Sequence, residues 1–286
     1  MLESAAKMSV LVFGPGFLGH RLAASLPGAV LSTADIADAA AVAAELERIQ
    51  PRSVINAAGK TGKPNVDWCE SHPFETFRSN VTGALTLAQA CHQANVHLVH
   101  LASGCVFYGP SPAPGGWRED DFANPSAVYS RSKYAADLAL SSLPDVAVAR
   151  LRMPIDGAPG SRNLITKLAG YPHVLDVENS VTVVDDLVQV VGELVERRAA
   201  GVFHVVNPGT MRHRDLLALY KELVDPGHQV ELVTPEQLLQ EGAIAKARSN
   251  CILSSTRLAD LGIRMRPIDV ALRDCMEQYA RASKAA

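Results

Sequence analysis

The sequence predicts an α/β protein, in which a doubly wound parallel sheet is joined to a smaller, mainly helical C-terminal lobe. Two observations predict it. Short apolar runs alternate with longer stretches of helical periodicity from Ser9 to Leu151, which is the pattern of a parallel sheet with helices on both faces. A glycine-rich turn directly follows the first apolar run, and doubly wound sheets bind phosphate groups at that turn. Together these features indicate a Rossmann fold.

The elements of the expected sheet follow in chain order. Strands are expected at Ser9–Phe13, Ala29–Leu31, Ser53–Asn56, Val96–Ala102 and Val146–Leu151. Helices are expected between them, at Phe17–Leu26, Asp38–Gln50, Phe74–Asn95 and Ser126–Ser142. Because crossovers between parallel strands are right-handed, these helices should cover both faces of the sheet.

Beyond Arg152, scattered prolines and glycines break the pattern. Further strands are expected at Val181–Val184 and Val202–Val206, with a helix over Asp185–Arg198 between them. The chain from Asn207 should be mainly helical, with one strand at Val230–Val233. We therefore expect a nucleotide-binding Rossmann domain in residues 8–160, to which residues 178–206 return. Residues 161–177 and 207–286 should form the substrate-binding lobe.

The composition excludes several classes of function. With 286 residues, 48% of them hydrophobic, the chain can bury a sizeable core. A formal net charge of −3 is too close to neutral to suggest a nucleic acid or a membrane surface as partner. No apolar run approaches the ~20 residues that span a bilayer, and Met1–Ser9 lacks the apolar core of a signal peptide. The cysteines show no disulfide or zinc spacing, so we expect free thiols in a cytoplasmic protein and no metal site.

The glycine-rich turn is a candidate dinucleotide site. It comprises Gly14, Gly16, Phe17, Leu18 and Gly19, at the point where the first strand passes into the first helix. Its glycines allow a tight turn and a close approach of the backbone to a pyrophosphate, which the N–H groups of the helix N-terminus would bind.

The end of the second strand selects between cofactors. An acidic residue there would bind the ribose 2′-hydroxyl of NAD, but the sequence has Ser32, with Asp35 slightly later. Small hydroxyl groups tolerate a 2′-phosphate, and His20 and Arg21 are close in sequence to the turn, so NADP(H) is preferred and NAD(H) remains possible. The alternative role for Asp35 is to cap the helix that begins at Asp38.

A YxxxK motif forms the candidate catalytic pair. Tyr129 and Lys133 are four residues apart on an expected helix and therefore share one face. A nearby ammonium favours the tyrosinate, so Tyr129 could exchange a proton with a carbonyl oxygen while a hydride moves to the carbon. Ser103, at the end of the fourth strand, is placed to hold the same carbonyl.

The glycine turn, the strand-end serine and the YxxxK motif, in this order, resemble the extended short-chain dehydrogenase/reductases over nearly the whole chain. Asn56–Gly59, Asn80–Gly83 and Val183–Asp186 resemble further motifs of that family. One departure is that Phe13 stands where the family has the first glycine of its loop.

Three further stretches are similar to one subgroup, the bifunctional nucleotide-4-keto-6-deoxyglucose 3,5-epimerase/4-reductases, which make nucleotide-linked L-rhamnose. They are Gly59–Glu70, Arg150–Ile155 and Arg162–Lys167. The dTDP-4-dehydrorhamnose reductases are a more distant resemblance.

This resemblance implies two proton-transfer residues, Cys105 and Lys167. Epimerisation at C3 and C5 removes and returns protons next to the C4 ketone, and Tyr129 and Ser103 would stabilise the enolate oxygen. Cys105, two residues beyond Ser103, should lie on the same strand end and face the same side. Cys69 is the rival thiol, although it is expected to pack beside Trp68, and Cys91, Cys251 and Cys275 are expected in the core.

The resemblance also implies binding residues. Ala57, Ala58 and Gly59 would contact the cofactor together with Tyr129 and Lys133. The nucleotide-sugar substrate would be bound by Lys60, Thr61, Asn65, Asn80, Asn163 and Arg248. Arg212 and Arg214 are weaker candidates, and a surface arginine is the alternative for each arginine. A homodimer is expected, with the 74–95 and 126–142 helices packing against their copies.

Two other functions remain open. The chain could be a monofunctional 4-ketoreductase or an epimerase of another nucleotide-deoxysugar pathway, and the presence of Cys105 and Lys167 favours the bifunctional enzyme instead. It could also be a non-catalytic NADP-sensing protein, but the intact set of Ser103, Tyr129 and Lys133 argues against this because a sensor needs no proton relay.

Overall fold

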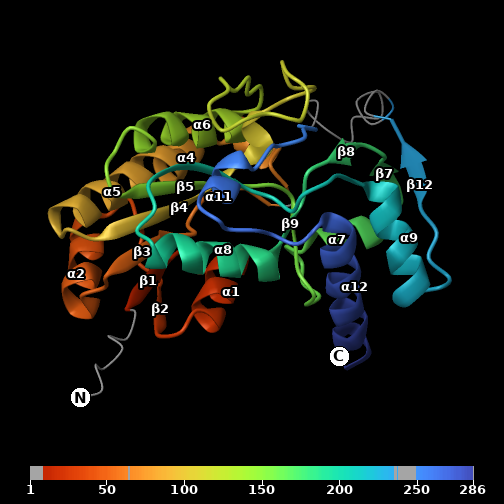
Figure 1. Cartoon of the computed structure of the whole chain (residues 1–286), viewed down its shortest axis with the longest axis horizontal. Coiled ribbons are helices and arrows are strands. Elements are labelled where there is room, and N and C mark those ends of the chain that lie inside the picture. The colour runs from red at the N-terminus through yellow and green to blue at the C-terminus, as the bar shows by residue number, and fades with distance from the viewer. Residues whose placement is uncertain (1–8, 64, 235–236, 238–248, 286) are drawn as a thin grey trace. The chain divides into compact units, whose positions relative to one another are not determined.

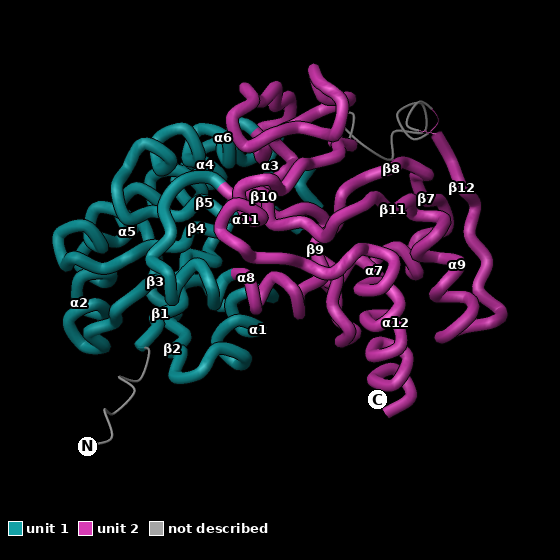
Figure 2. Tube along the Cα trace, viewed as in Figure 1, with its two compact units in different colours: residues 1–102, 131–149, 191–202 teal, residues 103–130, 150–190, 203–286 magenta. Residues whose placement is uncertain are grey.

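The computed structural model describes residues 9–63, 65–234, 237 and 249–285 (Figure 1). The chain forms two compact units, coloured separately in Figure 2. Unit 1 contains residues 1–102, 131–149 and 191–202, and unit 2 contains residues 103–130, 150–190 and 203–286. The domain boundaries expected from the sequence remain predictions, because compactness does not say which part binds a ligand.

A six-stranded sheet confirms the predicted α/β class. Its strand order is β10-β5-β4-β3-β1-β2. The strands are β1 (Val10–Phe13), β2 (Ala29–Ser32), β3 (Ser53–Asn56), β4 (His97–Ser103), β5 (Val146–Leu151) and β10 (Gly201–Val205). β1 pairs in parallel with β2 and β3, and β3 pairs in parallel with β4. The order reverses between β1 and β3, so the loops after these two strands flank the switch point where doubly wound sheets bind ligands.

Helices of unit 1 form because their apolar residues recur at helical spacing and can be buried. They include α1 (Phe17–Ser25), α2 (Ala39–Ile49), α3 (Trp68–Ser71), α4 (Pro73–Phe77) and α5 (Gly83–Gln93). The start of α2 is fixed by Asp38, whose side chain accepts hydrogen bonds from the N–H groups of Ala40 and Ala41. Val42 and Leu46 of α2 are buried in the core of this unit. Asp38, and not Asp35, is therefore the cap of this helix.

The expected helix over residues 74–95 contains a turn of π-helix. Arg78–Thr82 has this wider winding between α4 and α5. A π turn inserts one extra residue per turn and shifts the side chains that follow, and such turns occur often at functional sites. Here it carries Asn80, which is 1% exposed and bonds to the backbone of Lys60.

Unit 2 has its own core and several short strands. Its helices include α7 (Leu164–Ala169), α9 (His213–Leu223), α11 (Thr256–Asp260) and α12 (Ile268–Ala285). Two helices, α6 (Val128–Leu140) and α8 (Val184–Glu196), have residues in both units. The strand pairs are β6 (Pro154–Ile155) with β9 (Thr182–Val183), β8 (Glu178–Asn179) with β11 (Met211–Arg212), and β7 (His173–Leu175) with β12 (Glu231–Val233). The mainly helical character of the C-terminal part was predicted, whereas β11 was not.

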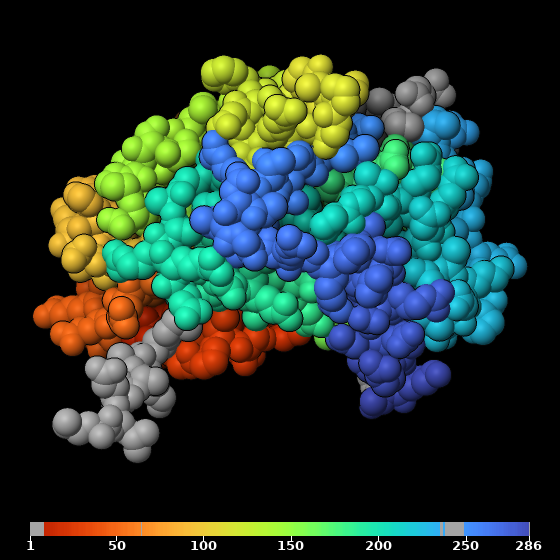
Figure 3. Space-filling model, viewed as in Figure 1, coloured from red at the N-terminus to blue at the C-terminus, as the bar shows by residue number. Residues whose placement is uncertain are grey.

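The C-terminal helix α12 lies at the surface of unit 2, as the space-filling view shows (Figure 3), and Val270 on it is 48% exposed. Within the described ranges, every helix is too short or too polar to cross a bilayer.

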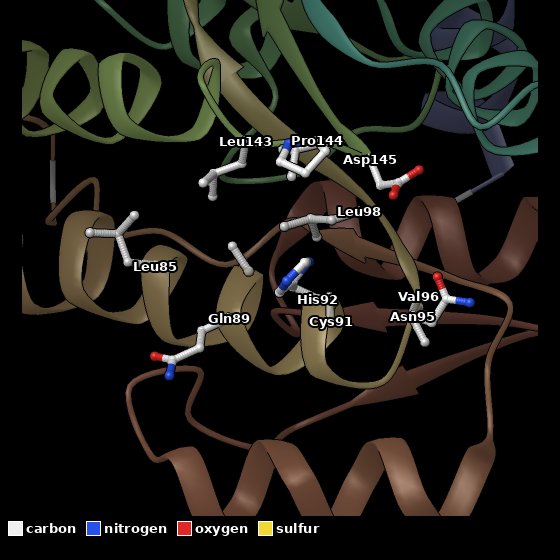
Figure 4. Close-up of a pocket in the computed structure, with 12 residues that line it drawn as sticks. Leu85, Gln89, Cys91, His92, Asn95, Val96, Leu98, Leu143, Pro144 and Asp145 are labelled. Carbon is white, nitrogen blue, oxygen red and sulfur yellow. The ribbon is translucent and has the colours of Figure 1, made fainter.

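A surface hollow in unit 1 lies far along the strands from the switch point. It lies between the C-terminal end of α5 and the loop before β5, and Leu85, His92, Leu98 and Leu143 are among its lining residues (Figure 4). His97 and Leu98 begin β4, so the hollow is at the amino end of that strand. Ligands of doubly wound sheets bind at the carboxyl ends, so we do not assign the active site to this hollow.

Four histidines of the fold are buried, namely His97, His100, His204 and His213. Burial, and to a smaller extent the nearby Arg150, lower the pKa of His204 to about 3. The native state therefore keeps this ring neutral, while the unfolded chain takes up a proton near pH 6.5. The unfolded state then binds more protons, so stability is lost as pH falls below about 6.5.

We predict that His204→Gln makes the free energy of unfolding less sensitive to acid. A histidine that stays neutral when folded contributes a loss of about 2 kcal/mol on going from pH 7.5 to pH 5. Urea denaturation of wild type and variant at these two pH values measures it. An equal loss in both proteins would show that His204 is not a source of acid sensitivity.

Candidate active site

The glycine turn between β1 and α1 packs against the loop after β3. Gly14 has φ +99°, and a Cβ built there would lie 2.3 Å from the backbone nitrogen of Ala58. A Cβ on Gly19 would lie 1.9 Å from the carbonyl oxygen of Gly14. Two of the three glycines are therefore required for the turn itself. Ala57 joins the same contact, because its N–H donates to the carbonyl oxygen of Phe13 at 2.9 Å.

Gly16 is different from its neighbours. A Cβ there would meet no atom within 4 Å. Gly16 is the N-cap of α1 and has no side chain that could accept from the first N–H groups of the helix. The space beside Gly16 is open, and Phe17 and Leu18, which begin the helix, are half-buried. A helix end with this geometry can bind a phosphate group.

The end of β2 has no carboxylate in its last position. Ser32 is 2% exposed, and its hydroxyl accepts a hydrogen bond from the N–H of Ala34. Asp35 follows on the surface and forms an ion pair of 2.8 Å with Arg78. A backbone hydrogen bond from Ala37 and the guanidinium of Arg78 lower the pKa of Asp35. The sequence did not predict the contact with Arg78, because Arg78 lies in the π turn, 43 residues further along the chain than Asp35.

A buried polar chain leads from the glycine turn to Lys133. The N–H of Ala58 donates to Asn56 Oδ1 at 3.0 Å, so the amide nitrogen of Asn56 faces His100, at 3.0 Å from its Nδ1. His100 Nε2 is 3.3 Å from Lys133 Nζ. Lys133 also donates to the carbonyl oxygen of Leu101 at 2.9 Å, near the carboxyl end of β4. Sequence reasoning did not single out His100.

The buried surroundings of Lys133 and His100 favour the neutral form of both side chains. Burial lowers the pKa of Lys133, and the negative charge of Asp137 opposes the shift. Burial also lowers the pKa of His100 well below its usual range, and Lys133 adds to the effect. Lys133 is thus easier to deprotonate than an exposed lysine, which suits a residue that takes part in a proton relay.

Tyr129 and Ser103 occupy the expected elements. Tyr129 is half-buried in the first turn of α6, four residues before Lys133 on the same helix. Ser103 is the last residue of β4 and is 6% exposed. Its hydroxyl accepts a hydrogen bond from the N–H of Cys105 at 3.1 Å.

The expectation that Cys105 continues the strand was wrong. β4 ends at Ser103, and Gly104–Val106 form a single turn of 3₁₀-helix. The alternation of strand side chains therefore does not apply to Cys105. The turn leaves Cys105 partly exposed, and its sulfur accepts a hydrogen bond from Arg152 Nη1 at 2.7 Å. Sequence reasoning named the segment that contains Arg152 but gave that residue no role.

The other cysteines are buried and free. Burial raises the pKa of the rival thiol, Cys69, and it raises the pKa of Cys91 to about 12. Cys91 and Cys275 lie in the cores of units 1 and 2, as predicted.

Lys167 lies half-buried on α7. Burial lowers its pKa, and the positive charge of Arg162 lowers it further. Asn163 begins the same helix as its N-cap and accepts from the N–H of Ile165 at 3.1 Å. Its amide nitrogen donates to the carbonyl oxygens of Asp156 and Ala158. The side chain of Asn163 therefore shapes the loop before Lys167, and its role in substrate binding remains a prediction.

The loop after β3 is ordered by side chains that were predicted to bind substrate. Asn80 Oδ1 accepts from the N–H of Lys60 at 2.6 Å, and its amide nitrogen donates to the hydroxyl of Ser132 at 2.9 Å. Asn65 accepts from the N–H of Asp67 in the following turn. Thr61 lies half-buried in this loop, and Arg248 lies outside the described residues.

Each unit thus assembles part of the predicted site. Unit 1 joins the glycine turn to Ala57 and Ala58, joins Asn80 to Lys60, and contains Lys133. Unit 2 contains Ser103, Cys105, Tyr129 and Lys167. Across the described ranges, no three His, Cys, Asp or Glu side chains cluster in a way that could hold a metal ion.

The family model of the RmlD substrate binding domain matches residues 8–281. The chain belongs to this family. The match runs through both units, and it confirms the resemblance seen in the sequence.

Several proteins similar to this chain are named as reductases, or as combined epimerase/reductases, of nucleotide-linked 4-keto sugars. The bifunctional dTDP-4-dehydrorhamnose 3,5-epimerase/dTDP-4-dehydrorhamnose reductase of Arabidopsis thaliana is 35% identical over 267 residues, which are 90% of this chain and 88% of that protein. A trifunctional UDP-glucose 4,6-dehydratase/epimerase/reductase of the same plant is 38% identical over 78% of this chain, which spans only 34% of that protein. The dTDP-4-keto-6-deoxy-D-glucose reductase of Streptomyces niveus is 32% identical over 74% of this chain and 77% of that protein.

Solved structures share the fold. The UDP-rhamnose synthase L780 of Acanthamoeba polyphaga mimivirus superposes with a TM-score of 0.88 at 28% identity, over 95% of this chain and 99% of that one. The dTDP-4-dehydrorhamnose reductase of Bacillus anthracis, solved in complex with NADP, has a TM-score of 0.81 at 21% identity, over 96% of this chain and 98% of that one. The second likeness bears on the fold alone.

We predict opposite outcomes for two substitutions in the glycine turn. Gly14→Ala forces a methyl group against the backbone of Ala58 at φ +99° and should destabilise the protein by about 3 kcal/mol or more. Gly16→Ala places its methyl group in open space and should change the free energy of unfolding by less than about 0.5 kcal/mol. Chemical denaturation of both variants measures the difference. Equal stability of the two would contradict the close packing at Gly14.

Proposed function

We propose that this protein is an NADPH-dependent 3,5-epimerase/4-reductase that converts a nucleotide-linked 4-keto-6-deoxyglucose into the L-rhamnose nucleotide. The reductase half is supported by family membership and by the buried environment of Lys133. The epimerase half rests chiefly on one observation, the partly exposed residue Cys105, whose sulfur accepts a hydrogen bond from a buried arginine. A cysteine that merely fills space has no need of a charged hydrogen-bond donor.

The residues of the glycine turn fit a dinucleotide cofactor. Gly14 allows the close packing of the turn, and the open space at Gly16 leaves the N-terminus of α1 free for a pyrophosphate. Ser32 in place of an acidic residue, with Arg78 beside Asp35, favours NADP(H), and NAD(H) remains possible. NADPH supplies the hydride when it is bound. Ala57, Ala58 and Gly59 would complete its site.

Reduction of the ketone needs one proton from the protein. We assign it to Tyr129, whose hydroxyl would donate to the C4 oxygen as that oxygen gains charge. Ser103 would hold the same oxygen through a second hydrogen bond. Lys133, on the same helix face as Tyr129, would return the proton to the tyrosine, and its lowered pKa suits that exchange.

Epimerisation needs protons to leave and return at C3 and C5. Both carbons are adjacent to the C4 ketone, so the carbanion formed at either one is stabilised as an enolate. Cys105 and Lys167 would carry these protons, and Ser103 and Tyr129 would hold the enolate oxygen. Reduction at C4 then fixes the new configuration. The lowered pKa of Lys167 supports its use as a proton carrier.

The substrate is proposed to be a dTDP- or UDP-linked sugar, because relatives with both nucleotides in their names match this chain. Lys60, Thr61, Asn65, Asn80, Asn163 and Arg248 remain the proposed substrate-binding residues. A homodimer through the helices around α5 and α6 remains our proposal as well. Large apolar side chains on these helices are exposed, including Phe74, Leu85 and Leu138.

We predict that Tyr129→Phe abolishes reduction while the cofactor still binds. The hydroxyl supplies the proton but makes no part of the glycine turn, so kcat should fall by about 10²-fold or more. Steady-state reduction of an already epimerised 4-keto sugar measures activity, and calorimetry measures the affinity for NADPH. Near-normal turnover in the variant would exclude Tyr129 as the proton donor.

We predict that Cys105→Ser separates the two reactions. A hydroxyl is far less acidic than a thiol, so proton exchange at C3 and C5 should fall by about 10²–10⁴-fold. Wild type incubated with the 4-keto substrate in deuterated water should incorporate deuterium at both carbons, and the variant should not. The variant should still reduce the epimerised sugar. Exchange at the wild-type rate would mean that Cys105 is packing only and that the protein is a simple reductase.

A further inference from the structure

Arg152 is a buried cation that has no carboxylate partner among the residues that the structure describes. Its side chain is 3% exposed. The guanidinium donates to Cys105 Sγ at 2.7 Å, to Asn179 Oδ1 at 2.6 Å and to the carbonyl oxygen of Ser249. Its Nε has no hydrogen-bond partner among the described residues. The amide and the carbonyl oxygen are neutral, so neither balances the buried positive charge.

The sulfur of Cys105 is the group that can supply the missing negative charge. A guanidinium stays protonated in proteins, and a buried charge is strongly unfavourable unless it is paired. Among the described residues, the titratable groups that interact with Arg152 are Cys105, Cys251, Tyr108 and His213, and the imidazole of His213 cannot supply a negative charge. Burial raises the pKa of Cys251, whose thiol donates to the carbonyl oxygen of Gly104 at 3.4 Å. The hydroxyl of Tyr108 is paired with Ser130 Oγ at 3.0 Å.

The backbone next to Cys105 and Arg152 is constrained. Gly104 is packed closely against Leu253, because a Cβ there would lie 2.5 Å from Leu253 Cδ1, and Arg152 lies beside it at ordinary contact distance. Met153, directly after Arg152, has φ +44° and precedes Pro154. A residue before proline disfavours helical backbone angles, and a non-glycine residue at positive φ is strained. Strain of this kind persists only where the surroundings enforce it.

We propose that Arg152 is a positioning residue that holds Cys105 as a thiolate, which makes Cys105 the base and Lys167 the acid of the epimerisation. This inference rests on the proposed function. The thiolate takes the proton from the carbon next to the ketone, and the C–H electron pair moves to make the enolate. The opposite face of that carbon then takes a proton from the ammonium of Lys167, which leaves a thiol and an amine. Proton exchange with water restores the thiolate and the ammonium.

The first test measures the charge state of Cys105 without any substrate. We expect iodoacetamide to alkylate Cys105 in wild type at pH 7 at least tenfold faster than in Arg152→Met, with the pH midpoint of alkylation at least one unit higher in the variant. Arg152→Lys, which keeps the charge, should lie between them. Peptide mass spectrometry distinguishes Cys105 from the buried cysteines. Arg150→Met is the matched control, because Arg150 is a buried arginine that donates to the carbonyl oxygen of Glu119 instead.

The second test links the thiolate to exchange at the sugar. Arg152→Met should lose deuterium incorporation at C3 and C5 at pH 7 by at least tenfold and regain much of it at pH 9, where the thiol ionises without help. Its reduction of an epimerised 4-keto sugar should stay within twofold of wild type. A purely structural role for Arg152 would not give recovery at high pH.

One measurement needs no change at Arg152 and covers the case in which the methionine variant does not fold. The difference in absorbance at 240 nm between wild type and Cys105→Ser should show a thiolate already at pH 7. A signal that grows in only near pH ~8.5, the range of a free cysteine, would overturn the inference. So would an unchanged alkylation profile in folded Arg152→Met. If the thiolate is present but Cys105→Ser still exchanges deuterium at the wild-type rate, the epimerase proposal fails while the charge pairing stands.

Discussion

The close contact between Gly14 and Ala58 is the constraint on which the rest of unit 1 depends. No side chain fits between these two backbones, so the turn after β1 and the loop after β3 are packed as one piece. That packing directs the N–H of Ala58 to Asn56, turns the amide nitrogen of Asn56 toward His100, and brings His100 to Lys133. One backbone contact thus shapes both the open end of α1 and the surroundings of the predicted catalytic lysine.

Unit 2 contains a buried positive charge, that of Arg152. It buries Arg152 without a carboxylate partner in the part of the chain that the structure describes, and in our proposal the sulfur of Cys105 is the matching anion. In our proposal, reduction uses the desolvated Lys133 and epimerisation uses the Arg152–Cys105 pair, while Ser103 and Tyr129 serve both reactions. A substitution in the Arg152–Cys105 pair should therefore leave reduction intact, and such single variants can separate the proposed activities.

The sequence predicted the longer elements well because their periodicity is local. β1, β5 and α2 each bury apolar residues at regular spacing, and such spacing can be read directly along the chain. Strands of two residues, such as β11, carry no period and form only where a distant strand is available. The 3₁₀ turn at Cys105 depends on Gly104 and Ser103 together, and alternation alone suggested a strand. The role of Arg152 could not be predicted because its partner, Cys105, lies 47 residues away in the sequence. The residues next to Arg152 give no sign of a contact with a thiol.

The most direct test of the proposed function is the product that wild-type protein makes. The protein should be incubated in deuterated water with NADPH and either dTDP- or UDP-4-keto-6-deoxyglucose, and the product should be examined by NMR. The account predicts an L-rhamnose nucleotide with deuterium at C3 and C5 and protium at C4, the position that receives the hydride. A reduced sugar without deuterium at C3 and C5 would contradict it, and so would a keto sugar left unreduced with both nucleotides.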